Sequence, residues 1–470
     1  MKKPELLVPA GSLERLKTAF LYGADVVYCG TPAMSLRAQS KFTMEDVMEG
    51  VEFAHSKGKK VYLTVNLFAH NKDIQRLPEY VETLRKIKPD GAIVADPAVF
   101  KFIHENLPEL NLHVSTQANV TSWLGVKFWQ DMGAKMCVLE RQLTFDELRE
   151  IREKCPDIRL ETFIHGSMCM SYSGRCLLSN YFTGRGANQG KCAHSCRWNY
   201  KIHIKLKEDI SKEILLNKDT KELFDFLLEE ECRPNDFLTI EETENGSYMM
   251  NSKDLCLLPV LPEFLKIGID CLKIEGRNKT QYYAGMVART YRKAIDDYFE
   301  NPDSWDYTKY LDELYTISNR GYTLAFAHGS PTELSSNYGM TKSLSEFEFA
   351  GYVQSWGNDY INVAVKNRLD AGDELEFLSP TKDETFKMTI NEFINAKTNE
   401  ITNVIHAGQE PVIRIPLEWF NNFNMSKEKI MVNLPPLTLI RKRKKLTEPE
   451  LERIKADKES FKKEIIGDIE

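Results

Sequence analysis

The sequence predicts an α/β fold: a (β/α)8 TIM-like barrel over residues 1–345, followed by a small C-terminal β-barrel domain. Three observations predict it. Short apolar runs alternate with longer helix-like stretches, polar residues follow most of these runs, and the helical spacing disappears near residue 345. Runs of strand-forming residues separated by helices indicate βα units and a parallel sheet.

We expect eight strands, in the runs 5–11, 24–30, 60–71, 91–97, 112–119, 135–141, 159–166 and 271–279. An open doubly wound sheet is the alternative. The barrel is favoured because strand ends converge on one face there, where active sites lie. The polar residues after the runs are Asn66, His70, Asp96, Gln117, Asn119, Glu140, Arg141, His165, Glu275 and Arg277. Taken singly, each of them could simply begin a loop.

Three further segments differ from the barrel pattern. Residues 346–440 alternate apolar and polar positions between turn signals, which predicts the β-domain. Residues 441–470 are rich in charge and are expected to form a tail or a solvated helix. Residues 203–232, which follow the cysteine-rich loop at 165–200, are interpreted as a charged helical insertion.

Composition limits the possible functions. The net charge is −7, so nucleic-acid binding is not implied for the chain as a whole. No apolar run approaches the roughly 20 residues needed to span a bilayer, and the first residues are too polar for a signal peptide. We therefore expect a cytoplasmic protein without a membrane partner.

Four cysteines gather in the glycine-rich loop 165–200: Cys169, Cys176, Cys192 and Cys196. In a reducing compartment such clustering indicates metal binding or redox chemistry rather than disulfides. Only the last two have the close spacing of a structural zinc site, whereas iron–sulfur clusters accept more varied loops. The alternative is that some are small buried hydrophobes. We expect that role for Cys29, Cys137, Cys155 and Cys271.

The same region is strongly basic. Residues 162–207 contain no Asp or Glu and seven Lys or Arg, a local charge of +7. They also contain Tyr172, Tyr181, Phe182, Trp198 and Tyr200, and such aromatic residues stack on unpaired bases in many RNA-binding proteins. The segment therefore favours an anion, a nucleic-acid backbone, or both, over a solvated basic face.

The run ETFIHGSMCMSYSGRCLLS at 161–179 resembles the signature of the collagenase-like peptidases, the unassigned peptidase family thirty-two. ELLVPAGSLE, NQGKC, SCRW, MNSKDLC and LKIEGRNK extend this resemblance over residues 1 to about 300. Length and the segment GRGANQGKCAHSCRW resemble the branch that hydroxylates tRNA. The resemblance implies conversion of a wobble uridine to 5-hydroxyuridine, with prephenate as a required metabolite.

The resemblance also implies a four-iron four-sulfur (4Fe-4S) cluster. Cys169, Cys176 and Cys192 match its ligand positions, and Cys232 is expected to be the fourth ligand, with Cys196 as the alternative. The partners implied are tRNA and a small dicarboxylate metabolite.

Other residues receive roles as hypotheses. Lys253, Asp254 and Glu275 are candidate catalytic residues at predicted strand ends, and each could equally be a structural ion pair. The β-domain and the basic run 441–445 are expected to contact tRNA. Candidates for binding carboxylates or phosphates are Arg175, Arg185, Arg197, Lys273 and Arg277. Two alternative functions remain: a collagenase-like peptidase, and a non-catalytic RNA-binding adaptor that holds zinc.

Overall fold

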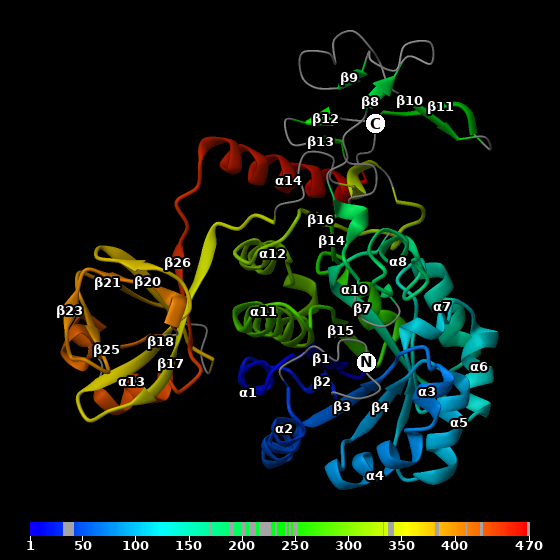
Figure 1. The fold of residues 1–470 in the computed structure, drawn as a ribbon, viewed down its shortest axis with the longest axis horizontal. Helices are drawn as coiled ribbons and strands as arrows, with labels where there is room; N and C mark the ends of the chain where they lie inside the picture. The colour runs from blue at the N-terminus through cyan, green and yellow to red at the C-terminus, as the bar shows by residue number, and fades with distance from the viewer. Residues whose placement is uncertain are drawn as a thin grey trace.

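The computed structural model describes residues 1–31, 42–169, 171–187, 192–198, 203–205, 213–215, 227–230, 233–239, 242–243, 246–247, 252–331, 333–336, 343–380, 385–409, 411–423 and 426–467. Figure 1 shows a helix-covered barrel beside a separate antiparallel β-domain, drawn in yellow to orange.

Eight parallel strands close into a barrel, because β15 pairs with β1 on one side and with β7 on the other. Each predicted run supplies one strand, so the predicted TIM-like barrel is confirmed. The strands are β1 (Glu5–Pro9), β2 (Val26–Gly30), β3 (Lys60–Val65), β4 (Gly91–Val94), β5 (Leu112–Val114), β6 (Met136–Val138), β7 (Arg159–Ser167) and β15 (Cys271–Ile274).

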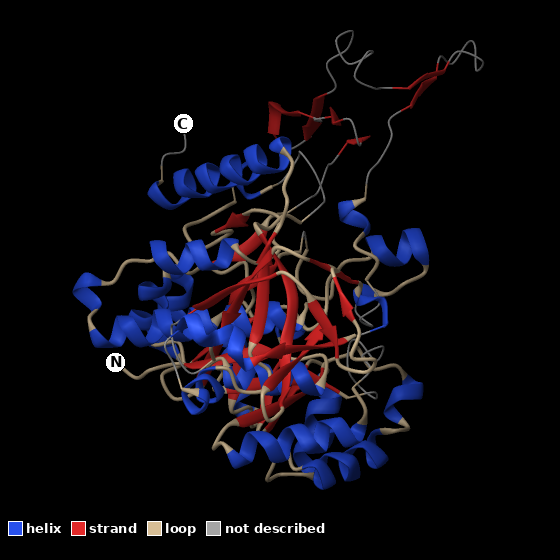
Figure 2. Ribbon diagram, turned by 90° about the vertical axis from the view of Figure 1, so that its left-hand side faces the viewer, coloured by secondary structure: helices blue, strands red, loops and turns tan. Residues whose placement is uncertain are grey.

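Helices cover the outside of the barrel (Figure 2). Ser12, Thr43, Asp96, Ser122 and Thr144 begin five of them, each accepting a hydrogen bond from a backbone N–H of the first turn. The helices are α1 (Leu13–Leu21), α2 (Met44–Ser56), α3 (Asn71–Ile74), α4 (Leu77–Ile87), α5 (Pro97–Asn106), α6 (Trp123–Asp131), α7 (Phe145–Lys154), α10 (Leu261–Ile267), α11 (Gln281–Glu300) and α12 (Thr308–Tyr315). None of the described helices is both long enough and apolar enough to cross a membrane.

A long detour separates β7 from β15. The end of β7 pairs antiparallel with β14 (Asp254–Cys256), which in turn pairs parallel with β16 (Tyr322–Thr323). This extra sheet edge, formed by β14 and β16, lies beside the barrel mouth, because β14 pairs with the last residues of β7.

The prediction of a helical insertion over 203–232 is wrong for the parts that the structure describes. Those parts are strands, and β8 (His203–Lys205) pairs antiparallel with β9 (Glu213–Leu215). The reason is visible in the sequence, where Ile202, Ile204 and Leu206 alternate with polar residues at the period of a strand. The further strands are β10 (Leu227–Glu230), β11 (Arg233–Thr239), β12 (Glu242–Thr243) and β13 (Gly246–Ser247).

The C-terminal domain is a curled antiparallel sheet with its own core, which includes Phe377, Phe393 and Phe420. It confirms the predicted β-domain. In spatial order its strands are β21 (Thr385–Ile390), β20 (Asp373–Leu378), β26 (Leu439–Arg443), β17 (Phe347–Trp356), β18 (Tyr360–Val365), β25 (Val412–Pro416), β22 (Phe393–Asn395) and β23 (Ile401–Thr402). The pair β19 (Leu369–Asp370) and β24 (Val404–Ile405) and helix α13 (Lys427–Asn433) complete the domain.

The basic run 441–445 does not present all its charge to solvent. Arg441 is buried, with its Nε 2.7 Å from Glu376 and its Nη1 3.0 Å from Glu313 of α12. Lys442 is also buried and lies 2.7 Å from Asp373. The expectation that this whole run contacts tRNA is therefore wrong for Arg441 and Lys442, which hold the β-domain together and fix it to the barrel.

After β26 the chain returns to the barrel as α14 (Glu448–Ile466), shown in red in Figure 1. Phe461 is fully buried in the barrel core. The Glu464 carboxylate accepts a hydrogen bond from the Leu324 N–H at 2.9 Å, directly after β16. The helix therefore supports the sheet edge formed by β14 and β16.

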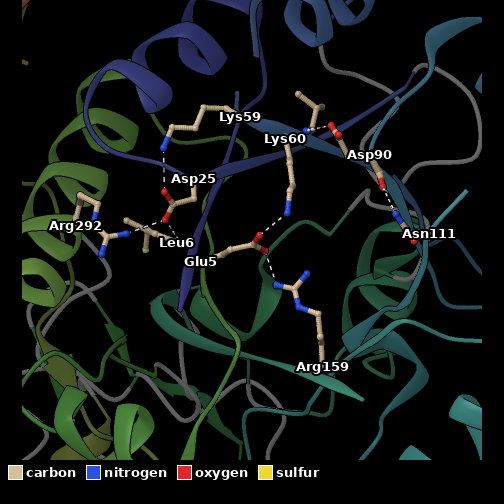
Figure 3. A network of polar contacts seen from close by, with 10 residues as sticks. Glu5, Leu6, Asp25, Lys59, Lys60, Asp90, Asn111, Arg159 and Arg292 are labelled. Carbon is tan, nitrogen blue, oxygen red and sulfur yellow. Dashed lines mark hydrogen bonds and ion pairs between the residues drawn. The ribbon is translucent and has the colours of Figure 1, made fainter. Parts of the chain in front are cut away.

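Ion pairs close the end of the barrel at which the strands begin (Figure 3). Glu5 of β1 lies 2.7 Å from Lys60 of β3 and 2.5 Å from Arg159 of β7. Burial raises the pKa of Glu5, but the bonds from Lys60 and Arg159 outweigh it and lower the pKa overall. Asp25 receives Lys59 at 3.0 Å and Arg292 at 2.8 Å. Since this end is occupied by structural pairs, the opposite end is available for function.

A substitution at Tyr22 tests whether the hydrogen bonds of this side chain stabilise the junction between the barrel and the β-domain. Its buried hydroxyl donates to the Leu378 carbonyl at 2.5 Å and accepts from the Leu439 N–H at 2.8 Å. Tyr22→Phe leaves both backbone groups without this partner, so the free energy of unfolding should fall by about 2 kcal/mol. Urea denaturation measures it. Tyr181→Phe, at a tyrosine that is 82% exposed, is the control and should cost less than about 0.5 kcal/mol. Equal losses in the two variants would contradict the role of Tyr22.

Candidate active site at the barrel mouth

The polar residues predicted to follow the strands divide into two groups. Asp96 caps α5 by accepting from the Ala98 and Val99 N–H groups, and His70 begins α3, so both have structural roles. His165 is buried inside the barrel wall, where burial and the Lys279 charge lower its pKa to about 3. Asn119, Glu140 and Arg277, in contrast, take part in contacts at the mouth.

A buried ion pair lies between two neighbouring strands below the mouth. Lys273 of β15 places its Nζ 2.6 Å from Glu161 Oε1 of β7, and both side chains are at most 4% exposed. The ammonium also lies 4.6 Å from the ring centre of Tyr28 and 5.2 Å from that of Phe163. Lys273 is therefore neutralised by its own neighbour and has aromatic faces around it.

Arg277 extends from the end of β15 towards β3. Its Nη1 donates to Thr64 Oγ1 at 2.8 Å, and its guanidinium lies 5.8 Å from the ring centre of Tyr28. The Tyr28 hydroxyl is 2.9 Å from the Ile274 carbonyl and 3.2 Å from Glu275 Oε2. The predicted residues Lys273, Glu275 and Arg277 are thus brought together around Tyr28.

A second group is centred on Glu140, at the end of β6. Its carboxylate accepts hydrogen bonds from Asn119 Nδ2 at 2.8 Å and from the N–H and hydroxyl of Ser173 at 3.1 and 3.2 Å. Gly174 has φ +78°, and a Cβ there would lie 2.8 Å from Gln117 Oε1. Glycine is therefore needed for this close approach, and the start of the cysteine-rich loop is fixed onto the barrel mouth.

Arg175 follows in the same loop and remains exposed. Its Nε donates to Asn119 Oδ1 at 2.5 Å, and its guanidinium lies 5.2 Å from the ring centre of Phe68, just after β3. The loop itself contains no carboxylate, but the fold places the carboxylate of Glu140 against it.

Lys253 and Asp254, predicted as catalytic residues, have structural partners. Lys253 Nζ donates to Ser460 Oγ of α14 at 2.9 Å, and burial lowers its pKa even though Asp457 and Glu464 act in the opposite direction. Asp254 forms a buried ion pair with Arg320. These contacts favour structural roles for both residues, Lys253 through a hydrogen bond to α14 and Asp254 through an ion pair.

The predicted metal ligands lie in the loops after β7. Cys169 is exposed, and Cys176, Cys192 and Cys196 are half-buried. Their donor chemistry fits an iron–sulfur cluster. Their arrangement does not, because no three His, Cys, Asp or Glu side chains among the described residues are placed to hold a metal ion. Cys232 lies outside the described residues.

The four cysteines predicted to be small buried hydrophobes are buried. Cys29, Cys137, Cys155 and Cys271 are buried in the barrel core. Burial raises the pKa of Cys29 and Cys137 to about 12 and keeps these thiols protonated.

Three side chains form an aromatic ridge: Tyr181 and Phe182 on α8 (Leu178–Thr183), and Trp198, which directly follows the 3-10 turn Ser195–Arg197. These side chains are 82%, 46% and 41% exposed. Phe182 has its ring centre 5.2 Å from Tyr181 and 6.3 Å from Trp198. Arg185 follows at the end of α8, while the side chain of Arg197 lies outside the described part of the structure.

A pocket of about 410 Å³ lies beside the start of the cysteine-rich loop. Cys169 and Tyr172 of the loop form one wall, Gln142 after β6 contributes to a second, and Thr323 at the end of β16 and Phe326 after it belong to a third. Sequence reasoning missed this pocket, as well as Tyr28, Thr64 and Phe163 at the mouth. The inward positions of β2, β3 and β7 were the available signal for those three.

Comparison with known proteins places the chain in a family. The family model described as peptidase family U32 matches residues 11–337, and its C-terminal domain model matches residues 345–426. The tRNA hydroxylation protein P of Haemophilus influenzae is 36% identical over 452 residues, covering 92% of this chain and 96% of that protein. Its Escherichia coli namesake is 38% identical over 415 residues, covering 84% and 90%.

A more distant relative is the Escherichia coli 23S rRNA 5-hydroxycytidine C2501 synthase, 30% identical over 296 residues, which cover 63% of this chain and 40% of that protein. Both family models and the long relatives agree with the resemblance seen in the sequence motifs. The chain therefore belongs to peptidase family U32.

Proposed function

We propose that the chain is an RNA-modifying enzyme that hydroxylates a wobble uridine of tRNA to 5-hydroxyuridine. The observation that carries this proposal is the aromatic ridge beside a basic loop at the mouth of the barrel, in a chain related to proteins named for tRNA hydroxylation. Exposed aromatic faces are costly unless they bind a partner, and unpaired bases stack on them.

Charge supports an RNA partner at this place. The segment 162–207 carries seven positive and no negative side chains, and Arg175 and Arg185 lie within it. Glu140, the carboxylate closest to the loop in the contacts above, is buried under Ser173 and Asn119. The outer surface of the loop therefore attracts phosphates while the ridge receives bases, and binding should weaken as salt rises.

A small dicarboxylate, prephenate, is proposed to bind at the mouth. Lys273 is already paired with Glu161, so the proposal assigns the carboxylates to Arg277 and Arg175. In the described contacts, Arg277 donates to Thr64 Oγ1 and Arg175 donates to Asn119 Oδ1. Both guanidinium groups border the end of β3, one at Thr64 and the other at Phe68, and each can form two parallel bonds with a carboxylate.

A 4Fe-4S cluster held by Cys169, Cys176 and Cys192, with Cys232 or Cys196 as fourth ligand, is proposed as the cofactor. The support is chemical, since these thiols are accessible and lie in a basic segment that would stabilise an anionic cluster. A bound cluster would supply electron transfer next to the substrate.

Hydroxylation of tRNA is tested in a deletion strain that lacks any second hydroxylating route. Mass analysis of digested tRNA should show loss of 5-hydroxyuridine and its derivatives, with restoration by the wild-type gene. Phe182→Ala should restore less than Leu124→Ala, a change at another exposed apolar residue, on α6, because only Phe182 belongs to the ridge. Unchanged nucleosides in the deletion strain would refute the tRNA role, and cleavage of gelatin by the pure protein, abolished by Cys169→Ala, would favour a peptidase.

The cofactor is tested by anaerobic purification with iron, sulfide and zinc analysis. Cys169→Ser, Cys176→Ser and Cys192→Ser should each lose iron and sulfide. Cys155→Ser should keep both, because its thiol lies buried with its Sγ donating to the Trp123 carbonyl, a bond that a serine hydroxyl can replace. Comparison of Cys232→Ser with Cys196→Ser identifies the fourth ligand. Zinc without sulfide would favour the adaptor function.

The dicarboxylate site is tested by calorimetric titration with prephenate. Arg277→Met removes the charge but keeps the apolar stem of the side chain, and should weaken binding by at least about tenfold. Arg368→Met is the control, because Arg368 is exposed in the β-domain and paired with Asp370. Equal affinity of the Arg277→Met variant and the wild type would show that the carboxylates bind elsewhere.

A further inference from the structure

The pocket beside Cys169 differs chemically from the barrel mouth. Six of its described lining residues carry hydroxyl groups: Ser171, Tyr172, Ser252, Thr323, Ser335 and Ser336. None of the lining residues that the structure describes is a Lys, Arg, His, Asp or Glu. The mouth, by comparison, contains the charged side chains of Arg175 and Arg277.

A neutral polar lining selects a neutral polar ligand. A dicarboxylate that left water for this pocket would lose its hydration without gaining a cation. An uncharged heterocycle has no such penalty, since hydroxyl groups can donate to or accept from its edge. Tyr172 and Phe326 add aromatic rings, on which a planar ligand can stack. The volume of about 410 Å³ is sufficient for a ligand of this size.

Gln142 gives the pocket a specific hydrogen-bonding group. Its Oε1 is buried and has no hydrogen-bond partner among the described residues. An amide presents one acceptor and two donors on the same plane. The edge of uracil offers the complementary pair, a donor at N3–H and an acceptor at O4. A buried acceptor without a partner is destabilising, and a ligand that supplies the donor removes that cost.

The walls of the pocket are held rigidly. Thr323 Oγ1 lies 3.0 Å from Ser335 Oγ and 2.8 Å from Glu464 Oε1 of α14, and it accepts from the Ala325 N–H at 2.9 Å. The Lys253 N–H also donates to the Ser335 carbonyl at 3.0 Å. Side chains fixed in this way before binding favour recognition of one ligand geometry.

We propose that this pocket binds the extruded uracil base of the RNA, with the Gln142 amide pairing to its N3–H and O4 edge and Tyr172 stacking on its face. The inference rests on the proposed function and deepens it, because it separates the base site from the dicarboxylate site. Enzymes that modify a base take it out of its stack into such a pocket and recognise its edge by hydrogen bonds. Cys169 lines the same pocket, so the base is placed next to a proposed cofactor ligand.

The test is a binding cycle with two anticodon stem-loop RNAs that differ at one atom. One carries uridine at the wobble position and the other carries N3-methyluridine, which lacks the N3–H donor. Fluorescence anisotropy of the full-length wild-type protein at fixed salt should show about tenfold weaker binding of the methylated RNA. Gln142→Leu should bind both RNAs equally. Gln130→Leu, at a similarly half-buried glutamine on α6, should keep the tenfold difference.

A second variant tests the pocket independently, in case the Gln142→Leu protein does not fold. Tyr172 is 49% exposed, so Tyr172→Leu is expected to fold. It should weaken binding of the uridine RNA by at least about fivefold, but not binding of an RNA that lacks the wobble base. The inference is overturned if Gln142→Leu still discriminates as the wild type does, or if the wild type does not discriminate. Absence of any RNA binding by the wild type would instead overturn the proposed function on which the inference rests.

Discussion

Closure of the barrel by β15 is the constraint on which the other features depend. This strand must fit between β1 and β7, yet more than 100 residues lie between the end of β7 at Ser167 and the start of β15 at Cys271. The intervening chain starts at the mouth, where β7 ends, and reaches the opposite end of the barrel only when it enters the parallel strand β15. Its strand β14 pairs with the last residues of β7 at the mouth. The intervening chain consequently places the cysteine-rich loop, β14 and the pocket wall around the mouth, where the strand ends already converge.

The Lys273–Glu161 pair is part of that closure. It joins β15 to β7 inside the barrel, at 2.6 Å and almost without solvent. Transfer of two charges from water is costly, and removal of one partner leaves the other charge uncompensated. Cation–π contacts with the faces of Tyr28 and Phe163 offset part of the desolvation penalty of the Lys273 ammonium. The pair thus fixes the register of the last strand and, with it, the position of Arg277 only four residues later.

The sequence was sufficient for the barrel strands because each is an apolar run that must be buried on both faces. β2, with Val26 to Gly30 all buried, is an example. The described parts of the insertion were misread because the charge of the segment suggested a solvated helix, although Ile202, Ile204 and Leu206 alternate with polar residues. The structural partners of Lys253 and Asp254 could not be identified from the sequence, since Ser460 and Arg320 are distant in it. Tyr28 and Thr64 lie within strands, so a search for polar residues after the strands could not find them.

Because Glu464 holds the pocket wall at Thr323 and Leu324, this wall depends on a helix near the end of the chain. Glu464 belongs to a helix that is synthesised more than 120 residues after β16, whose Thr323 and following Leu324 it holds. During translation the barrel strands are therefore complete well before this wall obtains its support. A nascent chain can close its barrel early, while the pocket beside Cys169 reaches its final shape only once α14 has emerged from the ribosome.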